Sequence, residues 1–325
     1  MRVEQRTWTE ALGWVPAFSS SLSGPGQLVF VFGATSKLHQ AELIEPLLRC
    51  YPAARMFGCS TAGEICDTTV SEESIVATAV CFEHAHVRLA TAVAARGAAS
   101  FQTGEILGNA LPAQAGGTGD GSSVEKLVHV LLLSEGIHVN GSALVRGLVG
   151  RLPEGVTARG GLARHGARFG ETAVFGQAGP PSDTATAVGL YGSRLRIGFG
   201  SKGGWDPYGP ERPITRSEGN VLFELDGRPA LALYKQYLGE HAQGLPATGL
   251  LFPLSVRAGA EDYAVVRTIL AVDEHRQSLT FAGDVPEGAY ARLAKASFER
   301  LIDGAMDAAQ SSREGASATA TGLAI

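Results

Sequence analysis

The stretch "RMFGCSTAGEI", residues 55–65, sets small hydroxyl and thiol side chains between two glycines, after an apolar start and before an acid. The apolar residues predict a short buried β-strand, and the glycines predict a loop whose backbone comes close to another group. Strands that end in such loops are typical of α/β proteins. The sequence on either side shows how this unit is completed.

An apolar run at 28–33 predicts a buried strand before this stretch, and leucines at helical spacing predict a helix over 37–51. After it, the strand-like runs 74–82 and 87–95 predict an antiparallel hairpin. The unit therefore reads strand, helix, strand, glycine loop, hairpin.

A second copy of this unit follows. It has a strand at 127–136, a helix at 142–152, a glycine-rich loop at 155–166 and closing strand-like runs up to residue 200. The predicted fold class is α/β, of the mixed α+β type. Duplicated strand-helix-strand-loop-hairpin units would form mixed sheets with flanking helices, in a chain of two domains.

We expect residues 1–26 to be an N-terminal extension and 27–200 to be a ligand-binding domain with internal repeats at 28–95 and 127–200. Its copies are joined by a flexible, glycine-rich stretch at 109–126. A second domain is expected over 201–325. It would hold strands, turns and a helix within 213–239, a hairpin within 265–288 and a helix over 289–310. The final "GLAI" predicts a strand just beginning, so this domain is expected to be cut short.

Composition excludes several classes of protein. A net charge of -5 and the absence of any Lys/Arg run argue against a nucleic-acid partner. The apolar runs are too short to span a bilayer, and the N-terminus has no signal-peptide core. Four cysteines without CxxC spacing favour a reducing, cytoplasmic location.

The glycine loop could serve several kinds of chemistry. Gly58 and Gly63 have the glycine spacing of a phosphate loop, but Glu64 stands where lysine is needed and would repel phosphate. Ser60 does not fit the G-x-S-x-G pattern. Cys59 or Ser60 could be a nucleophile if a base lay near it in space, and a small buried Cys59 is the plainer interpretation.

A binding loop remains the favoured interpretation. Glycine N–H groups and the hydroxyls of Ser60 and Thr61 could hold an acceptor, and Glu64 a donor. The alternative is that these side chains only satisfy nearby backbone groups. Polar and small residues also follow the strands of the second copy, where α/β proteins gather ligands. The predicted ligand-binding residues are Gly58, Cys59, Ser60, Thr61, Gly63, Glu64, Ser134, Glu135, Asn140, Gly160, Gly161, Arg164 and His165.

Several segments in order resemble one known family. "FGCSTAGEI" resembles the signature of the FIST N-terminal domain, and "LSEGIHVNGSALVRGL" and "ARGGLARHGARFGETAVF" are similar to its later motifs. "EGNVLFELDGRPALALYKQYLG", "LPATGLLFPLSV" and "FAGDVPEGAYARLAKASFERLIDGAMDAA" resemble the FIST C-terminal domain. The resemblance runs from about residue 27 to 310.

The resemblance implies a prokaryotic sensory input module in signal transduction that binds a small ligand, such as an amino acid, without catalysis. Its output would pass to a histidine kinase, as in a two-component system, or to another signalling protein. Some family members bind haem and sense nitric oxide, so haem is an alternative cofactor, with His138, His165 or His241 as ligand. Arg164-His165, Ala294 and Ser297 depart from the family pattern. An unpaired "GLAI" end would be an open strand edge, consistent with truncation or a homodimer.

Overall fold

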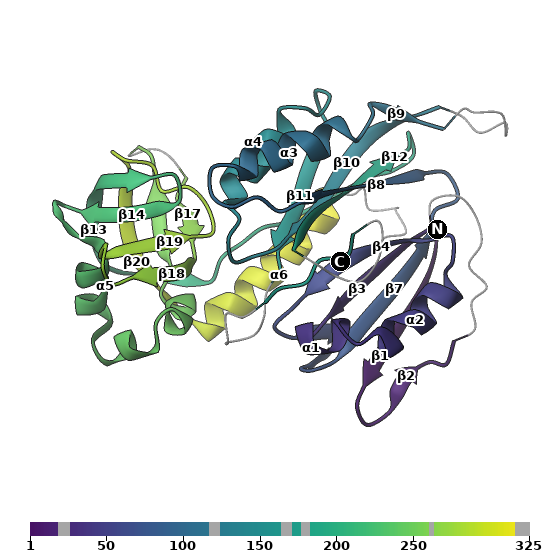
Figure 1. The fold of residues 1–325 in the computed structure, drawn as a ribbon, viewed down its shortest axis with the longest axis horizontal. Helices are drawn as coiled ribbons and strands as arrows, with labels where there is room; N and C mark the ends of the chain where they lie inside the picture. The colour runs from purple at the N-terminus through teal and green to yellow at the C-terminus, as the bar shows by residue number, and fades with distance from the viewer. Residues whose placement is uncertain (19–26, 117–123, 164–170, 177–182, 260–262, 316–325) are drawn as a thin grey trace. The chain divides into compact units, whose positions relative to one another are not determined.

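The computed structural model describes residues 1–18, 27–116, 124–163, 171–176, 183–259 and 263–315 (Figure 1). The chain divides into two compact units. The first comprises Met1–Val139 with Leu144–Leu195, and the second comprises Asn140–Ala143 with Arg196–Ile325. Both units pack helices on β-sheets, which confirms the predicted mixed α/β class.

The first half of the first unit is a five-stranded sheet with the order β2-β1-β7-β3-β4. β3 and β4 are parallel, because two helices connect them, and the other pairs are antiparallel. A small hairpin of β5 and β6 follows β4. The bounds are β1 (Arg2–Thr9), β2 (Gly13–Val15), β3 (Leu28–Gly33), α1 (Thr35–Leu38), α2 (Ala41–Cys50), β4 (Arg55–Ser60), β5 (Glu64–Cys66), β6 (Thr69–Ser71) and β7 (Ile75–Cys81).

The second half is a sheet with the order β11-β10-β12-β8, with β9 paired to β10. β10 and β11 are parallel and are connected through α4, whereas β12 is antiparallel to both β10 and β8. The bounds are β8 (His86–Val93), α3 (Ser100–Asn109), β9 (Gln114–Ala115), β10 (Glu125–Ser134), α4 (Gly141–Val149), β11 (Thr157–Leu162) and β12 (Thr184–Tyr191).

The two halves have the same strand arrangement in the same register. β1-β7-β3-β4 corresponds to β8-β12-β10-β11. At the end of β3, the Ala34 amide donates to the Ser74 carbonyl oxygen; at the end of β10, the Glu135 amide donates to that of Thr184. The loops that follow β3 and β10 are therefore equivalent, and so are those that follow β4 and β11.

The predicted hairpin of 74–82 with 87–95 is wrong. β7 pairs with β1 and β3, whereas β8 pairs with β12 in the other sheet. In each half, the last strand of the unit pairs with one further antiparallel strand. This partner is β1 for β7 in the first half, and β8 for β12 in the second. Neither β1 nor helix α3 was predicted, since β1 carries several charged residues and α3 has only a weak apolar stripe.

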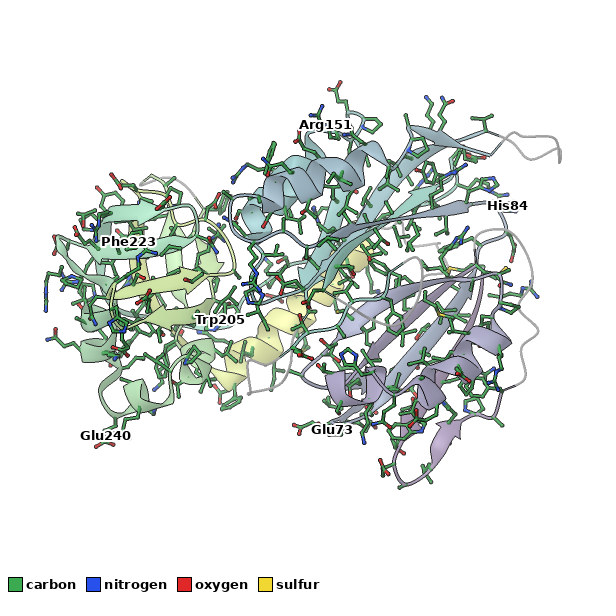
Figure 2. All side chains as sticks on the ribbon, in the orientation of Figure 1. Glu73, His84, Arg151, Trp205, Phe223 and Glu240 are labelled. Atoms are coloured by element: carbon green, nitrogen blue, oxygen red, sulfur yellow. The ribbon has the colours of Figure 1, made fainter. Side chains whose placement is uncertain are left out.

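Glycines let the two helices of the second half cross closely. A Cβ on Gly104 of α3 would lie 2.1 Å from the Leu144 carbonyl oxygen, and one on Gly147 of α4 would lie 2.0 Å from that of Phe101. Only residues without a side chain permit this approach. Arg151, labelled in Figure 2, forms an ion pair with Glu105 at the end of the helix pair.

The second unit is built on a large antiparallel sheet with the order β17-β16-β20-β13-β14-β19-β18, with β15 paired to β14. Helix α5 (Ala230–Leu238) buries Leu231, Leu233 and Tyr234 in the core of this unit. The remaining bounds are β13 (Trp205–Glu218), β14 (Val221–Leu225), β15 (Arg228–Pro229), η2 (Gly239–Gly244), η3 (Ala247–Leu251), β16 (Leu254–Arg257), β17 (Val265–Arg267), β18 (Ile269–Asp273), β19 (Ser278–Phe281), β20 (Tyr290–Ala296) and α6 (Phe298–Gly315).

Most elements predicted for this unit are confirmed, with one exception. The turns at Gly219 and at Asp226-Gly227 have positive φ angles, and β18 and β19 form the predicted hairpin. The helix predicted over 289–310 is wrong in its first third, because residues 290–296 form β20. Alternate side chains there enter the core while the backbone pairs with β13 and β16.

The predicted flexible stretch 109–126 contains the last residue of α3, strand β9 and the first residues of β10. Its middle, 117–123, lies outside the described residues, and so does the C-terminal stretch 316–325 with "GLAI".

Candidate ligand-binding site at the loop ends of the duplicated strands

The glycine of the opening stretch is required by strand packing. Gly58 lies within β4, and a Cβ there would sit 1.8 Å from the Val31 carbonyl oxygen of β3. Gly160 occupies the equivalent place in β11, where a Cβ would sit 1.7 Å from the Leu132 carbonyl oxygen of β10. The duplication has therefore kept one glycine in each half for the same close approach of backbones.

Ser60 ends β4 and is fully buried. Its amide donates to the Ala173 carbonyl oxygen at 2.8 Å, and its Oγ accepts a hydrogen bond from the Ala173 amide at 3.0 Å. The Thr61 amide donates to the Gly33 carbonyl oxygen, which continues the parallel pairing past the end of β4. Ser60 thus joins the first half of the unit to a segment that belongs to the second.

Glu64 is a buried carboxylate, 2% exposed, with three hydrogen-bond donors. Oε1 accepts from the Thr61 hydroxyl at 2.6 Å, and Oε2 accepts from the Ser74 hydroxyl at 2.6 Å and the Ser74 amide at 3.2 Å. A buried charge needs such partners. These contacts are the local backbone and side-chain bonds that the alternative interpretation expected. A Cβ on Gly63 would make only ordinary van der Waals contacts, with Val70 and Ser71, so no close backbone approach requires a glycine there.

Cys59 is 4% exposed, and its burial raises the pKa of its thiol to about 12. A nucleophilic cysteine instead has a lowered pKa and a base or cation near it. Its side chain therefore behaves as a small apolar group in this structure.

The loop after β10 holds a second buried carboxylate. Glu135 is 2% exposed, and its carboxylate accepts hydrogen bonds from the amides of Ile137 at 2.8 Å and His138 at 2.9 Å. The His138 ring, which is 42% exposed, places Nδ1 3.6 Å from the same carboxylate. Ser134, just before it, is fully buried, and its Oγ has no hydrogen-bond partner among the described residues.

The loops of the two halves meet at one dipeptide, Thr172-Ala173. The Gly136 amide donates to the Thr172 hydroxyl at 3.3 Å, and Ala173 exchanges two hydrogen bonds with Ser60. The structure therefore brings the predicted residue Ser60 and the loop that holds the predicted residues Ser134 and Glu135 to one short segment. The sequence predicted a strand here. In the structure, the next residue, Val174, forms an isolated antiparallel β-bridge with Cys59.

Other predicted residues lie elsewhere. Asn140 caps α4, because its Oδ1 accepts from the Ala143 amide, and its Nδ2 donates to Asp284 at 2.6 Å. These contacts belong to the second unit. Gly161 has open space where a side chain would point. Arg164 and His165 lie outside the described residues.

A surface hollow beside the His138 loop was not predicted. It measures about 580 Å³ and lies between the end of β8 and α3. The Gly97 amide, in the segment that forms its rim, donates to the His138 carbonyl oxygen at 3.1 Å. The only sign of this hollow in the sequence is the run of mostly small residues at 92–99, which leaves space beside α3. The lining residues are Ala92, Val93, Ala95, Ala98, Ala99, Gln102, Thr103 and Ile106.

The histidines differ in setting. His241 is exposed in η2, with its ring centroid 5.4 Å from that of Phe252. His129, which was not singled out in the sequence, is buried in β10, with Nδ1 2.6 Å from the Thr157 hydroxyl of β11. Burial, with a smaller effect of the Arg159 charge, lowers its pKa to about 4.

Among the described residues, no group of three or more His, Cys, Asp or Glu side chains is placed to hold a metal ion. No helix in the same part of the chain has both the length and the apolar character needed to cross a bilayer.

Comparison with known proteins identifies the family. No curated protein matches the chain. The model of the FIST N domain matches residues 27–228, and the model of the FIST C domain matches residues 230–325. FIST domains are generally associated with sensory signal transduction and the binding of small ligands. With both domain models matched in order over nearly its whole length, this chain belongs to the FIST family.

Proposed function

We propose that this chain is a non-catalytic input module of signal transduction that binds a small ligand in its FIST N region. The observation that carries this proposal is the apolar hollow next to the Glu135–His138 loop. The hollow is joined to that loop through the hydrogen bond from Gly97 to His138. A concave apolar surface with a few polar groups at one side is typical of small-molecule sites.

The chemistry of these residues favours a ligand with an apolar body and an amino group. Ile106 and Val93 offer apolar surface in the hollow. A carboxylate has about four acceptor positions, and the Glu135 carboxylate uses two of them for backbone amides. The amino group of an aliphatic amino acid could take a remaining position, while its side chain covers the hollow.

The buried thiol of Cys59 supports a binding role over catalysis. Its raised pKa disfavours the thiolate, and Ser60 Oγ is already engaged by the Ala173 amide. The output of ligand binding would go to a separate protein, such as a histidine kinase of a two-component system, in the cytoplasm.

Thermal unfolding with a panel of amino acids tests this proposal. A ligand at about 100 times its dissociation constant stabilises a protein by about 2.7 kcal/mol, which raises Tm measurably. Ile106→Asp in the hollow should abolish the shift. Leu12→Asp is a matched control, because Leu12 is also an exposed apolar residue but lies between β1 and β2. No shift with any amino acid, or an equal shift in Ile106→Asp, would contradict the proposal.

A haem-bound sensor is the second candidate, and the setting of His138 favours it. A ligating histidine usually turns its second ring nitrogen to a carboxylate, as His138 Nδ1 does toward Glu135 at 3.6 Å. The ring is partly exposed and belongs to the loop beside the apolar hollow, so His138 would hold the haem iron and the hollow would give apolar contact to the porphyrin. Haem would supply a gas-binding iron, and this chain would supply the histidine and the apolar contact.

An absorption spectrum after incubation with haem tests this second candidate. A Soret band that shifts with nitric oxide and is lost in His138→Ala, but kept in His241→Ala, would support it. A spectrum equal to that of free haem would leave the amino-acid sensor as the proposal.

A further inference from the structure

Helix α6 presents a row of large apolar side chains to solvent. Phe298, Ile302 and Met306 follow one another at intervals of four residues and are 82%, 62% and 66% exposed. Residues at this spacing lie on one face of a helix. Such a row is unusual on a free surface and indicates an interaction site.

The opposite face of α6 is fixed to the body of the second unit. A Cβ on Gly200 would lie 1.9 Å from the Ala308 carbonyl oxygen, and one on Gly204 would lie 2.3 Å from the Leu301 amide nitrogen. These glycines precede β13, which begins at Trp205, labelled in Figure 2. Because the backbones are in close contact, α6 cannot turn its apolar row inward without leaving this position.

The charges beside the apolar row are arranged symmetrically about Met306. Glu299 lies seven residues before it and Arg313 seven residues after it. Seven residues are nearly two helical turns, so all three lie along one side of α6. Glu299 and Arg313 are both exposed, and neither forms an ion pair with another of the described residues.

This arrangement of charges favours α6 of a second copy of the same chain, in antiparallel orientation, as the partner of the apolar row. Two α6 helices related by a two-fold axis at Met306 place Glu299 of each copy beside Arg313 of the other. A parallel pair would instead oppose like charges at both ends. Ala305 and Ala309, which are exposed on the same face, allow the two helices to approach closely.

We propose that α6 is a self-association surface that pairs antiparallel with α6 of a second copy. The apolar row would form the centre of the contact, and two Glu299–Arg313 pairs its ends. An anionic membrane surface is a poor alternative occupant, because α6 carries four acidic and two basic side chains. This inference does not depend on the ligand proposed above.

Sedimentation of the full chain over a range of concentrations tests the inference. The wild-type protein should be a dimer, and Ile302→Glu and Met306→Glu should be monomers with unchanged circular dichroism. A wild-type protein that stays monomeric at every soluble concentration, or a dimer that survives both substitutions, would overturn the proposal.

Charge reversal tests the antiparallel pairing. Glu299→Arg and Arg313→Glu should each raise the dimer dissociation constant about fivefold or more, and the double variant should restore it. Glu240→Arg, an exposed acid in η2 that is labelled in Figure 2, is the control and should have no effect. Failure of the double variant to restore the dimer would overturn this geometry.

Discussion

Ser60 and Ala173 exchange two hydrogen bonds, although 113 residues separate them in the sequence. The backbone of Ser60 donates in one bond, and its hydroxyl accepts in the other. Because Ser60 ends β4 and Ala173 precedes β12, this pair joins the two duplicated halves at their loop ends. A residue that resembles a ligand contact in the sequence therefore connects the two halves of the unit.

Ser60→Ala should lower the free energy of unfolding by about 1–3 kcal/mol, because the Ala173 amide would be left buried without an acceptor. Urea denaturation followed by circular dichroism measures this change. Ser36→Ala is the control. The Ser36 hydroxyl also makes one hydrogen bond, which it donates to the Glu73 carboxylate, but at an exposed position, so the expected change is below about 0.5 kcal/mol. Equal effects of the two substitutions would show that the Ser60–Ala173 contact is not what stabilises this region.

Neighbouring glycines in β11 should respond very differently to alanine. Gly160→Ala would place a methyl group 1.7 Å from the Leu132 carbonyl oxygen, so the strands must separate, at a cost of about 3 kcal/mol or more. Gly161→Ala meets no atom within 4 Å and should change stability by less than about 0.5 kcal/mol. Thermal unfolding of the two variants checks this contrast. A tolerated Gly160→Ala would contradict the close approach of β10 and β11.

The pattern of small residues predicted close approaches but could not tell what is approached. Gly58 and Gly160 approach the carbonyl oxygens of neighbouring strands, whereas a ligand was expected. Glu64 was expected to accept a hydrogen bond from a ligand or from nearby backbone donors, and one of its donors in the fold, Ser74, lies ten residues further on, across the β5–β6 hairpin. The sequence shows which groups need partners, and only the fold decides whether protein or ligand supplies them.

Strand pairing was the other point at which the sequence was insufficient. β7 and β8 are adjacent, apolar and separated by a short polar link, so the hairpin was the simplest prediction. The competing pairing uses β1, which carries three charged residues at alternate positions, Arg2, Glu4 and Arg6, and was therefore not predicted to be a strand. Helices and turns with local signals, such as α5 and the turn at Gly219, were predicted correctly because the residues that determine them are close in sequence.

Cys59 should be unreactive in the folded protein. Burial raises the pKa of its thiol to about 12, and the thiolate is the reactive form. Brief treatment with iodoacetamide at neutral pH, followed by peptide mass spectrometry, should label the partly exposed Cys50 and Cys66 first. Cys59 should be labelled only after denaturation in urea. Preferential labelling of Cys59 in the folded protein would instead support the nucleophile interpretation.

His129 should make the protein less stable in weak acid. Its pKa is about 4 in the folded chain, because burial and the Arg159 charge disfavour the imidazolium, and it is about 6.5 in the unfolded chain. Between these values the unfolded state binds a proton that the folded state does not. The free energy of unfolding therefore falls as pH drops below about 6.5, by roughly 3 kcal/mol once pH reaches about 4.

Urea denaturation at several pH values between 7 and 5 checks this dependence. His129→Asn keeps a hydrogen-bonding group near the Thr157 hydroxyl but does not titrate, so its free energy of unfolding should fall less steeply with acid than that of the wild type. His84→Asn, at an exposed site labelled in Figure 2, should follow the wild-type curve. If His129→Asn and the wild type lose stability in parallel, then His129 is not held neutral in the folded protein, and other groups cause the acid sensitivity.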